Sequence, residues 1–259
     1  MKGESGIIID KCATLCKESY RTETMQGNDF QYVFSRETGL DCFIGSSDDT
    51  TWVVFRGTET DKLNDVCTDA ITFRVKTPFL PEECKVHAGF LTQYMSGRSI
   101  IIDTIRFMKN PKVVCTGHSL GGALATLCAI DVEQTLEGDI ETFCVTFGSP
   151  RVGGKHFCRL FDAVIDNSFR FVDVNDPIPR VPFRAWGFKH VKGCFVCDED
   201  SFHPDINRVE SSSCACISVR DHGIELYEKS VSFTPLPHHI PPPRTPHPRT
   251  PHPHTPQDP

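Results

Sequence analysis

The sequence predicts an α/β fold in which a mostly parallel central sheet carries helices on both faces. Two observations support this prediction. Short apolar runs bounded by turn residues, such as residues 51–55 before Arg56-Gly57, predict buried strands. Segments with apolar residues at helical spacing, such as residues 89–108, separate these runs. Strands that alternate with helices of this length are typical of a parallel sheet covered on both sides.

The expected elements follow one another along the chain. Helices are predicted over residues 11–20 and 89–108, and a third follows a glycine-rich turn after Thr116 and continues to about residue 133. A helix-like stretch also follows His222. Strands are predicted in seven stretches: 31–34, 40–44, 51–55, 112–116, 142–147, 169–174 and 190–196.

Length and composition predict one globular domain followed by a tail. The chain has 259 residues, 39% hydrophobic and 24% charged, which are values typical of globular proteins. Eleven of its nineteen prolines lie in residues 235–259, where RTPHP occurs at both 244–248 and 249–253. Proline this dense is incompatible with helix or sheet. We therefore expect a domain over residues 1–233 and a disordered Pro/His/Thr-rich tail over residues 234–259.

Charge and apolar runs exclude several classes of protein. A formal net charge of −7 argues against nucleic-acid binding through a basic face and against strong electrostatic attachment to anionic lipid. No run approaches the roughly 20 apolar residues that span a bilayer, so no transmembrane segment is expected. The first twelve residues lack the apolar core of a secretory signal. These observations predict a cytoplasmic protein.

The thirteen cysteines are expected to be mostly reduced thiols. Their odd number, the chain length and the missing signal argue against a disulfide scaffold. Three lie within apolar runs, where a thiol behaves as a small hydrophobic group: Cys115, Cys128 and Cys144. Cys194-x-x-Cys197 and Cys214-x-Cys216 leave zinc binding or disulfides open as alternatives. Their spacing favours independent thiols, and we expect no metal.

The turn Gly117-His118-Ser119-Leu120-Gly121 is the strongest chemical motif. It fits G-x-S-x-G, with a predicted strand before it and a predicted helix after it. A strand that turns directly into a helix holds the serine in a strained backbone with its hydroxyl at the apex of the turn. The flanking glycines are needed because the two backbones converge there. Ser119 is therefore the candidate nucleophile, placed at a helix N-terminus that favours developing negative charge.

A nucleophilic serine needs a general base, and the base needs an acid that orients it. Among the acids downstream, Asp173 lies within an apolar strand, whereas Asp176 lies where Pro177 ends it. The carboxyl edge of a parallel sheet is where such folds place their sites, so Asp176 is the favoured acid. Asp173 is expected to make a structural polar contact.

Several histidines follow these acids. His222 stands between a loop and a helix-like stretch, a position from which an imidazole reaches over the sheet, and it is the favoured base. His190 leads into a predicted strand and is expected to be packed or solvated. His203 and the tail histidines are the remaining candidates. His118 is expected to point away from Ser119, as adjacent residues on a turn do.

The motifs taken together resemble those of the class 3 (fungal-type) lipases, an α/β-hydrolase family. The resemblance covers about residues 10–230. It rests on six separate motifs in order: Phe55-Arg56-Gly57-Thr58, Val86-His87-Ala88-Gly89-Phe90, the GHSLGG turn after Thr116, Thr146-Phe147-Gly148-Ser149-Pro150-Arg151-Val152-Gly153, Asn175-Asp176-Pro177-Ile178-Pro179 and Asp221-His222.

The resemblance implies an α/β-hydrolase fold and a set of site residues. It implies Ser119 as nucleophile, Asp176 as acid and His222 as base. It also implies an oxyanion hole formed by Thr58 and the backbone N–H of Leu120. Two donors aimed at one developing oxyanion each lower the barrier by roughly 3 kcal/mol, which makes this arrangement physically sensible.

The segment after Thr58 is where the family carries its lid, here within residues 59–84. Five apolar side chains fall there at helical spacing: Leu63, Val66, Cys67, Ala70 and Ile71. Such a stripe is expected either to cover the site and turn toward lipid at an interface, or to be packed down permanently. Family members often have Trp where this chain has Asp65 or Val66, so the stripe offers little anchoring surface.

These observations predict a serine hydrolase that cleaves carboxylic ester bonds of lipids, as a triacylglycerol lipase or a related acylglycerol lipase does. No metal or organic cofactor is expected. The expected partner is a lipid or ester substrate at an oil–water or membrane interface. Two alternatives remain open: an esterase for short-chain soluble esters, and a non-catalytic lipase-like binding protein.

Overall fold

The computed structural model describes residues 3–58, 73–136, 138–198, 201–204 and 222–233. Three expectations therefore lie outside the described residues: the tail over residues 234–259, the apolar stripe between residues 63 and 71, and the pair Cys214 and Cys216. The side chain of His203 lies outside them as well. In the part of the chain that is described, no helix is long and apolar enough to cross a membrane.

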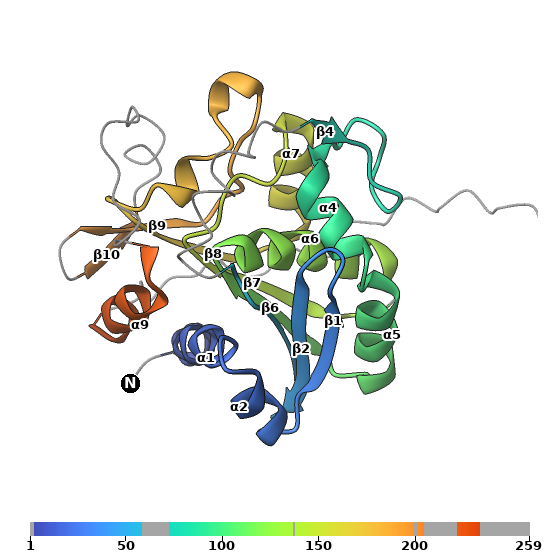
Figure 1. Ribbon diagram of the computed structural model, residues 1–259, viewed down its shortest axis with the longest axis vertical. Coiled ribbons are helices and arrows are strands. Elements are labelled where there is room, and N and C mark those ends of the chain that lie inside the picture. Colours follow the sequence, from blue (N-terminus) through green and yellow to red (C-terminus); the bar gives the residue numbers. More distant parts are fainter. Residues whose placement is uncertain (1–2, 59–72, 137, 199–200, 205–221, 234–259) are drawn as a thin grey trace, which may run out of the picture.

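The centre of the molecule is an eight-stranded sheet (Figure 1). Its spatial order is β1 (Gln31–Ser35), β2 (Leu40–Ser47), β3 (Thr50–Phe55), β6 (Lys112–His118), β7 (Glu141–Phe147), β8 (Asn167–Asp173), β9 (Cys194–Asp198) and β10 (Ser201–Pro204). The five strands from β3 to β9 run parallel, while β1, β2 and β10 pair antiparallel at the two edges. The predicted mostly parallel sheet is confirmed.

Helices cover both faces of this sheet (Figure 1). One face carries α1 (Glu4–Glu18), α2 (Thr22–Gly27) and α9 (Ile224–Phe233). The other carries α4 (Ala88–Met95), α5 (Arg98–Met108), α6 (Leu120–Thr135) and α7 (Lys155–Val164). The first and last helices of the described chain, α1 and α9, thus lie in the same layer.

Alternation within the strands explains why they are apolar throughout. In β3, Val53 and Phe55 enter the core under α4 to α7, whereas Trp52 and Val54 enter the core under α1, α2 and α9. Because successive side chains of a strand point to opposite faces, a strand with helices on both sides needs apolar residues at every position. Each core therefore excludes water from one face of the sheet.

The helices differ from the sequence-based expectation, and α2 and α7 have no counterpart among the predicted ones. Residues 89–108 form two helices, α4 and α5, because the chain bends at Gly97, where a Cβ atom would collide with Leu40. The first helix begins at Glu4, seven residues earlier than expected, because Ile8 and Ile9 extend its buried face.

Short elements complete the fold near the carboxyl edge of the sheet. They are β4 (Arg74–Val75), β5 (Val86–His87), and the 3-10 turns η2 (Ile178–Arg180) and η3 (Arg184–Trp186). β4 pairs with β5, and isolated bridges join Val86 to Gly153 and Gly153 to Lys189. The β4–β5 pair is thereby connected through Gly153 to the loop that follows η3.

Candidate active site

Ser119 lies on the sharp turn between β6 and α6, and its backbone is strained. Its φ of 57° and ψ of −130° are values that a residue with a side chain rarely adopts. Close backbone packing imposes this conformation: a Cβ atom at Gly117 would collide with the backbone of Gly121, and one at Gly121 with the carbonyl of Phe55. The glycines of the motif thus let β3, β6 and α6 approach each other around the serine.

The serine hydroxyl is buried and chemically unsatisfied. Ser119 N donates to Phe147 O and Ser119 O accepts from Gly122 N, both at 2.9 Å, so its backbone is fixed on both sides. Its Oγ has no hydrogen-bond partner among the residues that the structure describes. A buried hydroxyl without a partner costs stability, roughly 1–3 kcal/mol, and such groups are found where function requires them.

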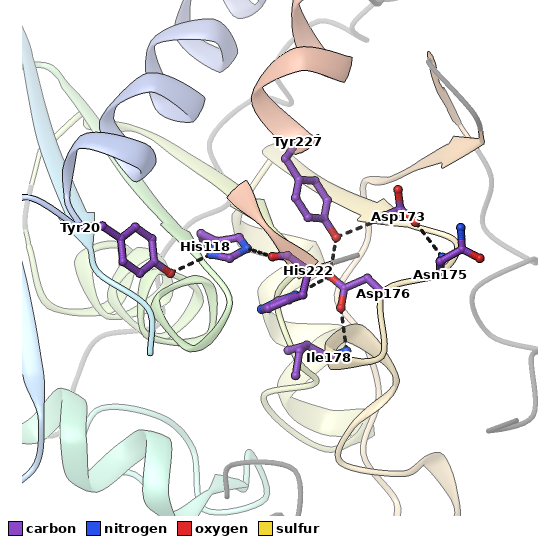
Figure 2. A network of polar contacts seen from close by, with 8 residues as sticks. All are labelled: Tyr20, His118, Asp173, Asn175, Asp176, Ile178, His222 and Tyr227. Atoms are coloured by element: carbon purple, nitrogen blue, oxygen red, sulfur yellow. Dashed lines mark hydrogen bonds and ion pairs between the residues drawn. The ribbon is translucent and has the colours of Figure 1, made fainter. Parts of the chain in front are cut away.

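His222 and Asp176 form a fully buried pair (Figure 2). His222 Nδ1 donates to Asp176 Oδ2 at 2.6 Å. With its proton on Nδ1, the neutral imidazole carries its lone pair on Nε2, and this atom has no hydrogen-bond partner within the described ranges. The ring therefore holds an available base in a site shielded from water.

Two further donors fix the carboxylate of Asp176. Ile178 N donates to Oδ1 at 2.8 Å, and Tyr227 Oη donates to Oδ2 at 2.5 Å. Burial, together with the neighbouring Asp176 charge, raises the pKa of Tyr227 well above its ordinary value, so its hydroxyl stays protonated and able to donate. Tyr227 follows His222 by five residues at the start of α9, so one segment supplies both partners of Oδ2.

Gly148, in the loop after β7, permits this arrangement. Its φ is +58°, and a Cβ atom there would lie 2.7 Å from Asp176 Oδ2 and 2.9 Å from His222 Cε1. Gly148 N also donates to Phe171 O at 2.9 Å, which fixes the loop against β8. Only glycine leaves room for the pair at this position.

Asp173 and His190, the other described candidates for the acid and the base, do not bond to this pair through their side chains. Asp173 Oδ1 accepts from Asn175 N at 2.7 Å, within its own turn. His190 Nε2 donates to Pro179 O at 2.6 Å, and its surroundings, chiefly through burial, lower its pKa well below the ordinary value. Of the described candidates, only Asp176 and His222 therefore come together.

A second hydrogen-bond chain, which the sequence does not reveal, reaches His222 from behind (Figure 2). Tyr20 Oη lies 2.8 Å from His118 Nδ1, and His118 Nε2 lies 2.7 Å from the carbonyl oxygen of His222. His118 is thus directed toward the segment that carries His222. No local pattern signals Tyr20 or Tyr227, because their partners lie 51 to 98 residues away in sequence.

Of the two residues expected at the oxyanion hole, Leu120 follows Ser119 directly and Thr58 is next in sequence to Gly57, which lies against Ser119. Thr58 follows Gly57, where a Cβ atom would lie 3.1 Å from Ser119 Cβ. Leu120 is the first residue of α6, and both side chains are half-buried. Backbone N–H groups at the start of a helix are free to bind an anion, so this is a suitable place for developing negative charge.

The chemistry available here is therefore nucleophilic. The serine turn follows β6, and the pair of imidazole and buried carboxylate lies beyond the end of β8, so all three groups lie at the carboxyl edge of the sheet. Nowhere in the described ranges do three or more metal-ligating side chains gather. Cys194 is buried, while Cys214 and Cys216 lie outside those ranges, so the alternatives of zinc binding or a disulfide there are not addressed by the described residues.

Comparisons with known proteins agree with this geometry. The sequence profile of the family described as Lipase (class 3) matches residues 52–186. A lipase of Rhizomucor miehei is 36% identical over 152 residues, which cover 56% of this chain and 41% of the relative. The solved structure of a triacylglycerol lipase, whose catalytic centre is described as a serine protease triad, superposes with a TM-score of 0.64. That structure shares 29% identity and covers 73% of this chain and 78% of its own.

A further relative corrects one expectation. Secreted mono- and diacylglycerol lipase 2 of Gibberella zeae is 32% identical over 152 residues, which cover 53% of this chain and 36% of the relative. Relatives named as secreted contradict the cytoplasmic location predicted from the first twelve residues, so that prediction is wrong. The N-terminal sequence is an insufficient guide to location.

These matches cover part of each protein. The chain spans less than half the length of each of the two lipases compared above by sequence. The family profile nevertheless covers more than half of the chain and includes the serine turn and Asp176. The structure adds the α/β-hydrolase architecture that the motifs implied. The chain therefore belongs to the class 3 lipase family.

Proposed function

We propose that this protein hydrolyses carboxylic esters of acylglycerol lipids through an acyl-enzyme formed on Ser119. The observation that carries the proposal is the buried His222–Asp176 pair with Nε2 of the imidazole left vacant beside the strained serine turn. The relatives named as mono- and diacylglycerol lipases support the substrate class. Their description as secreted proteins also favours an extracellular site of action.

In the proposed reaction, His222 Nε2 accepts the Ser119 hydroxyl proton as Oγ bonds to the ester carbonyl carbon. The Asp176 carboxylate stabilises the resulting imidazolium through Nδ1. When the tetrahedral intermediate collapses, the bond to the alcohol oxygen breaks, and this oxygen takes the proton from His222. Water then attacks the acyl-enzyme with His222 again accepting a proton, and the fatty acid and free Ser119 are released.

We assign stabilisation of the tetrahedral oxyanion to the Leu120 N–H and to Thr58. Ser119 is at the N-cap of α6, so the first free N–H groups and the positive end of the helix dipole lie beside the reacting carbon. Gly57 brings the Thr58 turn against Ser119 from β3. Loss of one such donor lowers kcat about 100-fold to 1,000-fold in other hydrolases.

Exposed aromatic side chains support a lipid surface as the place of action. Phe73 is 81% exposed, and Trp186 and Phe183 in and before η3 are 44% and 38% exposed. The two segments are neighbours, because a Cβ atom at Gly187 would lie 2.7 Å from Arg74 Nη2. Aromatic side chains, Trp above all, are enriched where proteins meet the boundary between lipid and water.

The function is tested by hydrolysis of p-nitrophenyl esters from C2 to C16 and of emulsified triolein. Wild type is compared with Ser119→Ala and with a matched control, Ser99→Ala, whose serine is exposed on α5. We expect activity on long-chain esters that Ser119→Ala abolishes and Ser99→Ala retains. Activity restricted to C2–C4 would indicate an esterase. No activity above Ser119→Ala on any substrate would refute the proposal and favour a binding protein.

The lipid-surface part of the proposal has its own test. Trp186→Ser is expected to lower the ratio of triolein hydrolysis to p-nitrophenyl acetate hydrolysis about tenfold, because burying one Trp at an interface contributes roughly 1.5–3 kcal/mol. Phe107→Ser is the matched control, since Phe107 is 85% exposed on α5. An equal ratio in wild type and both variants would contradict a role for the Trp186 turn.

A further inference from the structure

His222 is held at two points by the described part of the chain. Its imidazole is bonded through Nδ1 to Asp176, and its main-chain carbonyl oxygen lies 2.7 Å from His118 Nε2. The bond to Asp176 alone leaves the ring free to pivot about the Nδ1–Oδ2 axis. A second bond at the main chain removes that freedom and fixes the direction in which Nε2 points.

The hydrogen-bond partners determine the protonation of His118. A carbonyl oxygen only accepts, so His118 Nε2 must carry a proton and donate to His222 O. Burial and the neighbouring His222 lower the pKa of His118 well below its ordinary value, so the ring is neutral and its Nδ1 accepts. Tyr20 Oη, 2.8 Å away, is therefore the donor to Nδ1, and it selects the tautomer that donates to His222.

A neutral His118 is also required by its position. The rings of His118 and His222 face each other, with centroids 4.5 Å apart and planes inclined by 30°. In the proposed reaction His222 becomes an imidazolium, and a charged ring at this distance would repel it. A neutral His118 carries no net charge to oppose proton transfer to His222.

The same two residues support the opposite side of the site. A Cβ atom at Gly57 would lie 2.5 Å from His118 O and 2.6 Å from Tyr20 Oη. The turn leading to Thr58 is thus seated on Tyr20 and His118, and Ser119 follows His118 directly. Three segments that are distant in sequence therefore share one support: the Gly57–Thr58 turn, the serine turn and the start of α9.

We propose that Tyr20 and His118 are positioning residues, which set the His222 main chain relative to Ser119 so that Nε2 faces the serine hydroxyl. The inference rests on the proposed function, because it assigns these residues a role in proton transfer by His222. Neither residue is required to contact the substrate. Their effect is expected in kcat, with KM unchanged, because they act on the chemical step.

Two substitutions at His118 separate positioning from packing. His118→Leu removes the donor to His222 O, whereas His118→Gln places an amide N–H near the position of Nε2 and retains it. We expect His118→Leu to lower kcat about 100-fold, because a displacement of about 1 Å has an effect of that size. His118→Gln is expected to recover most of this loss in kcat, although its melting temperature equals that of His118→Leu.

The decisive control repeats His118→Leu in a His222→Ala background. If His118 acts through His222, the second substitution lowers the residual kcat no further, because the two residues work as a unit. Tyr20→Phe should also lower kcat, but by less than His118→Leu. The His118 ring stays in position in this variant and loses only the Tyr20 hydroxyl that selects the tautomer with its proton on Nε2. An equal loss in both backgrounds, or no rescue by Gln, would overturn the inference.

Failure of this inference is distinguishable from failure of the proposed function. A wild-type protein no more active than Ser119→Ala would refute the proposed function. Unchanged kcat in an active His118→Leu variant would refute positioning alone. If the protein shows no turnover, the low-field NMR resonance of the His222 Nδ1 proton tests positioning directly. We expect this resonance in wild type and His118→Gln, and we expect it to be broadened or lost in His118→Leu. An identical resonance in all three proteins would contradict the inference.

Discussion

The serine turn and the segment that carries His222 are built in different ways. The residues that shape the turn of Ser119 are contiguous in sequence, because Gly117 and Gly121 let its strand, its helix and β3 approach each other. His222 is fixed by side chains 46 and 104 residues away, Asp176 and His118. A short sequence motif therefore encodes one half of the site, whereas the other half requires side chains that only the fold brings together.

This difference has an energetic consequence. The strain at Ser119 is maintained by backbone contacts between β3, β6 and α6, which cannot relax without moving the sheet. His222 is maintained by a few side-chain hydrogen bonds, each contributing about 1–3 kcal/mol. We expect substitutions on the serine side to affect folding and activity together, and those on the His222 side to affect chiefly activity.

The largest expected effect is on the His222 side. Asp176→Asn removes the charge that orients and stabilises the His222 imidazole, and we expect kcat to fall about 10⁴-fold. Steady-state kinetics on a soluble ester measure it. Asp173→Asn is the matched control, because it makes the same substitution in the same loop at a carboxylate that accepts from Asn175 N and does not bond to His222 in the described contacts. A comparable loss in Asp173→Asn would mean that the acid has been wrongly assigned.

On the serine side, Gly121→Ala should combine both kinds of damage. Its new Cβ collides with the Phe55 carbonyl, so we expect a stability loss of about 1–3 kcal/mol and a fall in kcat of about 100-fold. Gly138→Ala is the control, because the new methyl group at Gly138 meets open space. The positive φ of 111° at this position still causes some backbone strain in the variant. Chemical denaturation and kinetics measure the two effects. Full activity in a destabilised Gly121→Ala would contradict the coupling of turn geometry to catalysis.

The serine turn is more predictable from the sequence than the segment that carries His222, for the same reason. The strand, the glycines and the following helix are all contiguous around Ser119, so periodicity and spacing place it on its turn. Chain order and the position of Pro177 predict Asp176 and His222 as acid and base, and the structure brings these two together. The hydrogen-bonding roles of Tyr227, Tyr20 and His118 are not predictable from the sequence, because only the folded chain brings their partners next to them.

The break of the predicted helix over residues 89–108 has a similar cause. Apolar residues continue at helical spacing through both α4 and α5, so periodicity alone gives no reason to divide it. The division at Gly97 follows from contact with Leu40 and Val33 on neighbouring strands, which is tertiary information. The cytoplasmic location was predicted wrongly for a different reason, because the motifs of the fold and the site carry no information about secretion.

The His222 side also contains a buried titrating group. In the folded state the pKa of His118 lies well below its ordinary value, so below about pH 6.5 the unfolded chain binds more protons. Stability therefore rises with pH across this window and is constant above it, as far as His118 contributes. Between pH 7.5 and pH 5 one such group accounts for at most about 2 kcal/mol, the value reached when it stays neutral in the folded state throughout.

His118→Gln should therefore narrow the difference in unfolding free energy between pH 7.5 and pH 5 by about 2 kcal/mol. Urea denaturation at the two pH values measures this difference. His87→Asn is the positive control: burial lowers the pKa of His87 to about 4, so its removal should narrow the same difference by a similar amount, and Asn retains an acceptor for Phe90 N. If the difference in unfolding free energy between the two pH values were the same in His118→Gln as in wild type, the folded state would not lower the pKa of His118.

The smallest effect is expected for Tyr227→Phe. Removal of the hydroxyl takes one donor from Asp176 Oδ2, and we expect kcat to fall about tenfold, equivalent to about 1.4 kcal/mol. Tyr94→Phe is a matched control, because Tyr94 Oη donates to the buried Asp131 at 2.7 Å, away from the site. That control should lose stability and keep kcat. Equal kcat in Tyr227→Phe and wild type would limit Tyr227 to a structural role.

The most direct test of the account is covalent labelling of Ser119 with a fluorophosphonate, followed by intact and peptide mass spectrometry. The reagent forms a bond between Oγ and phosphorus, and fluoride leaves as the hydroxyl proton passes to His222. We predict one label per chain on Ser119, slow labelling of His222→Ala and none at this residue in Ser119→Ala. Wild type that remains unlabelled, or that is labelled to the same extent as Ser119→Ala, would contradict an activated serine at this turn.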